Sequence, residues 1–90
     1  MDASVQHAIR SFVVRNFLFG DAADLNDDSS FLETGVIDST GVLELVGFIE
    51  STFGIVVDDA DLVPANLDSV NRAVRYVTRK QAEREPRLAG

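Results

Sequence analysis

Two side chains in this 90-residue sequence could take part in nucleophilic chemistry, Ser39 and the only histidine, His7. A serine nucleophile needs a base within hydrogen-bond reach and a third group that orients the base. His7 falls in the first predicted helix at a position typical of a helix surface, and the sequence contains no cysteine. These residues do not make a catalytic triad, so we expect a protein that is not an enzyme and has no catalytic residues.

The fifteen acidic residues raise the alternative of a calcium-binding helical protein. The segment that begins at Asp24 resembles the start of an EF-hand loop. Counted from Asp24, the sixth position is Ser29, where that loop needs glycine, and the twelfth is Gly35, where it needs a bidentate glutamate. The sequence therefore predicts no dedicated metal site, and it leaves weak binding of divalent ions open.

Charge is distributed unevenly along the chain, whose formal net charge is −7. Residues 21–68 contain twelve acidic side chains and no Lys or Arg, whereas residues 69–90 contain six basic and two acidic side chains. Nucleic acid and anionic membrane surfaces are therefore poor partners, but the acidic middle would attract basic protein surfaces. The start MDASVQ has no signal-peptide pattern, and no apolar run approaches the ~18 residues of a membrane span. We expect a monomer in the cytoplasm with no membrane insertion.

Apolar residues at helical spacing predict three main helices. They are expected over residues 3–17, over residues 39–53, and from Asp68 or Ser69 to about residue 80. Asp2 or Ser4 is placed to cap the first helix, and Gly20 follows its end. The core-facing residues of the second and third helices are expected to be Val42, Leu45, Val46, Ile49, Phe53, Val70, Ala73, Val74 and Val77.

The segments between these helices are predicted to be short or irregular. Residues 21–38 form a long loop, in which Ser30 and Glu33 have capping-box spacing and predict one helical turn. Residues 58–63 predict a brief helix that is stopped by Pro64, and residues 81–90 are expected to fray. The fold class is therefore all-α: a single domain over residues 1–90, built as an antiparallel four-helix bundle with three main helices, one short helix and a long first loop.

The most informative segment runs from Gly35 to Val57 and reads GVIDSTGVLELVGFIESTFGIVV. By position alone, Ser39 is an ordinary helix N-cap. The whole run, however, resembles the attachment region of acyl carrier proteins and peptidyl carrier proteins, with a glycine before an Asp-Ser pair, an apolar helix containing Glu-Leu-Val, and a closing Phe-Gly-Ile. The resemblance continues through the Asp-rich segment and residues 66–70, so it covers nearly the whole chain.

The resemblance implies a freestanding carrier protein in fatty-acid, lipid or secondary-metabolite synthesis. Ser39 matches the serine that receives 4'-phosphopantetheine from coenzyme A through a phosphopantetheinyl transferase. The thiol of that group carries an acyl or aminoacyl group as a thioester. A phosphodiester at the first turn of a helix is favoured by unpaired N–H groups and the helix dipole, and Gly35 and Gly41 are expected to leave space beside it. The implied partners are the transferase, an acyl- or aminoacyl-activating ligase, and downstream synthases or transferases with basic docking patches.

One face of the second helix is predicted to point away from the core. At 100° per residue, Leu43 and Glu44 lie on this face close to Ser39. We expect the partner-binding residues to be Asp38, Thr40, Leu43, Glu44 and Gly47. Thr40 and Gly47 replace the larger apolar residues that are usual in the family, which indicates a specialised set of partners. The alternative function is an unmodified, carrier-like acidic docking module, and the sequence leaves the cargo open.

Overall fold

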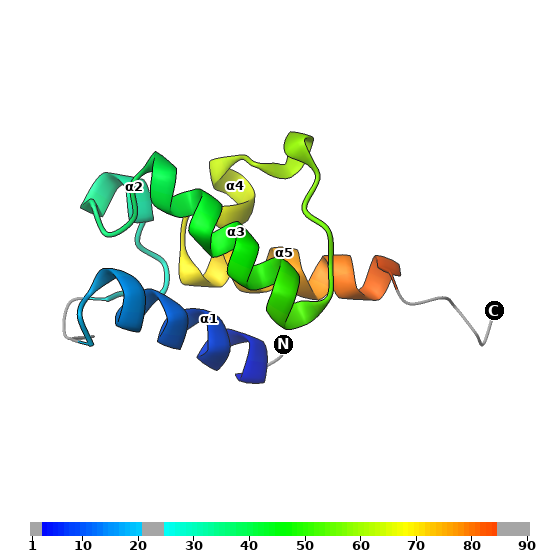
Figure 1. The fold of residues 1–90 in the computed structure, drawn as a ribbon, viewed down its shortest axis with the longest axis horizontal. Coiled ribbons are helices and arrows are strands. Elements are labelled where there is room, and N and C mark those ends of the chain that lie inside the picture. Colours follow the sequence, from blue (N-terminus) through cyan, green and yellow to red (C-terminus); the bar gives the residue numbers. More distant parts are fainter. Residues whose placement is uncertain (1–2, 21–24, 85–90) are drawn as a thin grey trace.

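The structure is a computed structural model that describes residues 3–20 and 25–84, and their regular structure is entirely helical (Figure 1). The elements are α1 (Ala3–Phe17), α2 (Phe31–Thr34), α3 (Ser39–Phe53), the 3-10 turn η1 (Asp59–Asp61), α4 (Pro64–Leu67) and α5 (Val70–Arg84). The predicted all-α class with three main helices is confirmed. Helix α1 runs in the opposite direction to both α3 and α5, which run the same way (Figure 1).

The core lies where α1, α3 and α5 meet. Helix α1 contributes the buried side chains of Val5, Ile9 and Val13, and α3 contributes those of Leu45 and Ile49. From α5, the predicted Val70, Ala73, Val74 and Val77 are all buried, together with Tyr76, which the periodicity had not indicated. Three other predicted core-facing residues of α3, namely Val42, Val46 and Phe53, are half-buried and pack against this core. The predicted core face of α3 is therefore confirmed, with its edges partly exposed.

The loop before α3 is held in place by polar contacts. Ser30 caps α2 as predicted, because its hydroxyl accepts the Glu33 N–H at 3.0 Å. Further upstream, the Asp27 carboxylate accepts from Arg10 and from Gln6, the latter at 2.7 Å. Asp24, the first residue of the calcium-loop comparison, lies outside the described residues.

Two helix boundaries differ from the prediction. Pro64 does not stop a helix over residues 58–63: only the 3-10 turn η1 forms there, and Pro64 is instead the first residue of α4. Proline suits this position, because its missing N–H would have no helical partner there and its φ is already helical. At the other end, α5 continues through Arg84, so residues 81–84 of the expected frayed tail are helical. Residues 85–90 lie outside the described residues.

The first helix begins at Ala3, as predicted, but one of its two expected caps does not hold the capping position. Ser4 is the second residue of α1, so it does not cap that helix. Asp2, the alternative cap, lies outside the described residues. At the other end, Gly20 has the expected left-handed conformation, with φ of 86°.

Candidate functional site

Ser39 is the first residue of α3, and the residue before it does the capping. The Asp38 carboxylate accepts a hydrogen bond of 2.7 Å from the Gly41 N–H, and the Asp38 carbonyl accepts the Val42 N–H at 3.0 Å. The interpretation of Ser39 as an N-cap is therefore wrong. Its side chain is exposed, and within the described part of the chain its hydroxyl makes no hydrogen bond. The hydroxyl is thus available for covalent chemistry.

The start of α3 offers a favourable site for a negatively charged group. The N–H groups in the first turn of a helix have no partner inside the helix. Asp38 accepts the N–H groups of Gly41 and Val42. The other two N–H groups of this turn, those of Ser39 and Thr40, have no acceptor among the described residues. Together with the positive end of the helix dipole, they favour an anion such as a phosphodiester at this position.

Gly41 packs against the core and not beside Ser39. A Cβ atom at this position would lie 2.9 Å from the Phe17 ring and 2.9 Å from Ile37 Cγ2, closer than side-chain atoms normally approach. Gly41 is therefore required for the contact between α1, the α2–α3 loop and α3. The expectation that Gly41 leaves space around the attachment serine is wrong. Gly35, with φ of 78°, is the left-handed C-cap of α2.

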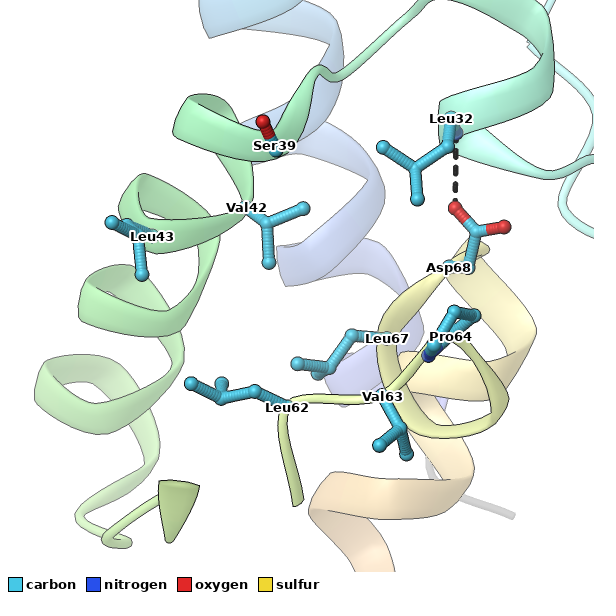
Figure 2. Close-up of a pocket in the computed structure, with 9 residues that line it drawn as sticks. All are labelled: Leu32, Ser39, Val42, Leu43, Leu62, Val63, Pro64, Leu67 and Asp68. Atoms are coloured by element: carbon cyan, nitrogen blue, oxygen red, sulfur yellow. Dashed lines mark hydrogen bonds between the residues drawn. The ribbon is translucent and has the colours of Figure 1, made fainter. Parts of the chain in front are cut away.

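An apolar cavity of about 280 Å³ adjoins Ser39. Figure 2 shows Val42 reaching into it from α3, and Leu62 and Leu67 extending toward α3 from the opposite side. Its lining residues are Leu32, Ser39, Val42, Leu43, Leu62, Val63, Pro64, Leu67 and Asp68. They come from α2, α3 and the η1–α4 region, so no local sequence pattern indicated the cavity.

Asp68 lines this cavity and joins α2 to the α4–α5 junction. Its carboxylate accepts the Leu32 N–H at 3.0 Å, drawn in Figure 2, and also the Ser30 hydroxyl. Its carbonyl accepts the Phe31 N–H at 2.9 Å. These bonds satisfy three donors at the start of α2, and they explain why a carboxylate that is only 8% exposed is tolerated here.

The expected outward face of α3 is exposed as predicted. Leu43 is 62% exposed, and Thr40, Glu44 and Gly47 are exposed beside it. A Cβ atom at Gly47 would meet no atom within 4 Å, so this face is open at that point. Exposure alone does not identify a binding surface, and the docking role of these residues and of Asp38 stays a prediction.

The other candidate side chains do not join this site. His7 is exposed on α1, where its Nε2 lies 3.5 Å from the Ser11 hydroxyl. In the part of the chain that the structure describes, no three His, Cys, Asp or Glu side chains are grouped so that they could hold a metal ion. The described helices also include none with the length and apolar character needed to cross a bilayer.

Comparison with known proteins agrees with this geometry. A family model described as the phosphopantetheine attachment site matches residues 16–77. The chain belongs to this family. The acyl carrier protein of Solidesulfovibrio magneticus (strain ATCC 700980 / DSM 13731 / RS-1) is 29% identical over 80 residues, which cover 89% of this chain and 99% of that relative. The resemblance noted in the sequence is thereby confirmed: this chain is a carrier protein, a non-catalytic role, and its cofactor is phosphopantetheine.

The residues around Ser39 fit this cofactor. An exposed hydroxyl without a structural role can be esterified, and the first turn of α3 can accept the negative charge. The adjoining cavity is formed between α2, α3 and the η1–α4 region, and most of the side chains that line it are apolar. The carrier thus offers both an exposed hydroxyl and an apolar surface beside it.

Proposed function

We propose that this protein is an acyl carrier in which Ser39 receives 4'-phosphopantetheine. The observation that carries the proposal is the position of the Ser39 hydroxyl, exposed at the first turn of α3 and directly beside an apolar cavity. The cofactor, when attached, supplies a thiol that holds the cargo as a thioester. The carrier's own residues supply the hydroxyl, the helix N-terminus and the walls of the cavity.

The cavity favours an apolar acyl cargo over an aminoacyl cargo. Its walls are side chains of Leu, Val and Pro, and burial of each methylene group contributes about 0.8 kcal/mol. Its one carboxylate, Asp68, already accepts hydrogen bonds from Ser30 and Leu32. An ammonium group placed here would lose its hydration without gaining an uncommitted partner, which is unfavourable.

The proposed partners are basic surfaces of the transferase, of an acyl-activating ligase and of downstream synthases in fatty-acid, lipid or secondary-metabolite synthesis in the cytoplasm. Leu43 would supply an exposed apolar contact beside Ser39, and Glu44 would supply a negative charge next to it. Complementary charge raises the rate of association and excludes acidic partners. We propose that the monomer docks through this face of α3.

Intact mass after coexpression with a broadly active phosphopantetheinyl transferase tests the attachment site. The wild-type chain should gain one phosphopantetheine, and Ser39→Ala should gain none. Thr52→Ala is the matched control, because it removes an exposed hydroxyl near the other end of α3 and leaves Ser39 and the expected docking residues in place. An unmodified wild-type chain would favour the alternative, an acidic docking module without a cofactor.

Thermal unfolding of loaded forms tests the cargo. A carrier loaded with an apolar acyl group that enters the cavity should melt at a higher temperature than the unloaded cofactor-bound form, because cargo that binds only the native state stabilises it. A carrier loaded with an aminoacyl group should melt close to the unloaded form. The reverse order would contradict the proposal of an acyl cargo.

A further inference from the structure

The cavity wall opposite α3 is held by burial only in part, because Leu67 of α4 is 3% exposed but the segment before α4 is not buried. That segment contributes Leu62 and Val63, which are 37% and 41% exposed. The adjoining turn η1 has no side-chain capping hydrogen bond and no buried residue. By contrast, α3 is anchored in the core by Leu45 and Ile49, each with no exposed area. The Leu62–Val63 part of the opposite wall is therefore not fixed by its own burial, and other contacts must hold it in position.

Asp61 supplies that support, because it binds elements on both sides of the wall. Its carboxylate oxygen Oδ2 accepts a hydrogen bond of 2.8 Å from the Tyr76 hydroxyl on α5. The Lys80 ammonium, also on α5, lies 3.8 Å from the same oxygen. The Asp61 carbonyl accepts the Val63 N–H at 2.8 Å and the Asn66 side-chain amide of α4 at 2.9 Å.

The α5 side of this contact is rigid. Tyr76 is 1% exposed, so its ring is fixed in the core and only its hydroxyl reaches Asp61. Burial of the ring and the hydrogen bond to the Asp61 carboxylate both raise the pKa of Tyr76, which keeps the hydroxyl protonated as a donor. Lys80 is held in turn between Asp61 and Asp58, whose Oδ2 lies 3.6 Å away. The directly following residues, Leu62 and Val63, take their position from this anchored aspartate.

We propose that Asp61 is a positioning residue that, through Tyr76 and Lys80, sets the separation of the Leu62–Val63 wall from α3 and so the size of cargo that the cavity shelters. The inference deepens the proposed function, since it rests on the cavity being the cargo site. The contacts themselves belong to the unmodified chain, where they can be tested without any cofactor.

The first test is hydrogen exchange on the unmodified protein, with Tyr76→Phe as the main variant because it removes only the hydroxyl. The amides of Leu62 and Val63 should exchange about tenfold faster than in wild type, while those of Leu45 and Ile49 change less than about twofold. Asp59→Asn is the matched control on the same turn, since Asp59 is exposed and its side chain contacts neither Tyr76 nor Lys80 among the described residues. It should behave as wild type.

Asp61→Asn provides a second variant that keeps an acceptor for Tyr76 but loses the charge that faces Lys80. Its exchange at Leu62 and Val63 should lie between wild type and Tyr76→Phe. Unchanged exchange at these two amides in both variants would overturn the proposal. An equal increase in the exchange rates of the Leu45 and Ile49 amides would overturn it as well. The contact between Asp61 and Tyr76 would then stabilise the whole fold and not the Leu62–Val63 wall in particular.

The second test uses the cofactor-bound carrier loaded with straight-chain acyl groups from butyryl to palmitoyl, and measures thioester cleavage by hydroxylamine. In wild type, the thioester should be cleaved most slowly for acyl chains of one preferred length. In Tyr76→Phe, cleavage at this preferred length should be faster, and the slowest cleavage should be found at a longer chain. Asp59→Asn should keep the wild-type dependence on chain length. An unchanged profile in Tyr76→Phe would overturn the specificity role. A chain that accepts no cofactor contradicts the proposed function instead, and the exchange result distinguishes that failure from this one.

Discussion

The Asp38 carboxylate accepts a hydrogen bond of 2.7 Å from the N–H of Gly41, which lies three residues further along the chain, in the first turn of α3. This contact fixes the start of the helix without involving Ser39, whose hydroxyl is left exposed. Structural and chemical roles are therefore divided between adjacent residues, with capping assigned to Asp38 and attachment proposed for Ser39. This division makes the two roles separable by mutation.

Ser39→Ala should leave the stability of the fold almost unchanged. The side chain is exposed and does not cap α3, and substitutions at such positions usually change the free energy of unfolding by no more than about 0.5 kcal/mol. Urea unfolding followed by circular dichroism measures this difference. A loss near 1 kcal/mol or more would mean that Ser39 does contribute to the helix start.

Asp38→Ala should destabilise the protein by about 1 kcal/mol, because the Gly41 N–H loses its acceptor. Asp38→Asn is the matched control, since its amide oxygen can still accept this hydrogen bond. The same urea experiment should place Asp38→Asn near wild type. Equal losses in the two variants would show that the charge of Asp38, and not its capping bond, stabilises α3.

Gly41→Ala and Gly47→Ala should have opposite effects, although both lie in α3. Alanine at position 47 meets no atom within 4 Å and should stabilise the exposed helix by about 0.5–1 kcal/mol. At position 41 the same helix preference is opposed by contacts of 2.9 Å with Phe17 and Ile37, so Gly41→Ala should be less stable than Gly47→Ala by about 1–3 kcal/mol. Comparable melting temperatures for the two variants would contradict this packing argument.

The rate of modification should depend on salt through the acidic surface near Ser39. Exposed charges are screened beyond about 10 Å at ~0.1 M salt, so added salt should slow association with the transferase. Glu44→Lys should reproduce much of this loss at low salt, whereas Leu43→Ala should weaken binding with little dependence on salt. Modification rates across a salt series measure both effects. Rates that do not depend on salt, with Glu44→Lys equal to wild type, would identify this surface as merely solvated.

Much of the fold could be predicted because it depends on neighbours in the sequence. The boundaries of α1 and α3 follow from apolar spacing and from the glycines that end each helix. The turn at α2 follows from the spacing of Ser30 and Glu33. The exposure of Leu43 follows from its angle on the helix relative to Leu45 and Ile49.

The errors arose where one residue type suits two local structures. Proline both ends helices and begins them, so Pro64 was assigned to the wrong side of a boundary. Asp and Ser are both good N-caps, and only the backbone shows that Asp38 holds that position. Tyr76 and Asp68 were missed as buried residues, because the hydrogen-bond partners that make burial of their polar groups possible are distant in sequence.

The sequence by itself determined the helical class, the main helices and the Asp-Ser pair at the start of α3, since these depend on periodicity and on residues within a few positions of one another. Only the tertiary structure decided that a cavity adjoins Ser39, that Asp68 lines it and that Asp61 is hydrogen-bonded to Tyr76. The cavity requires Leu32, Val42 and Leu62 to meet across three separate elements. Such contacts form only when the helices pack, and helix periodicity shows which face of a helix is apolar but not which distant residue it will meet.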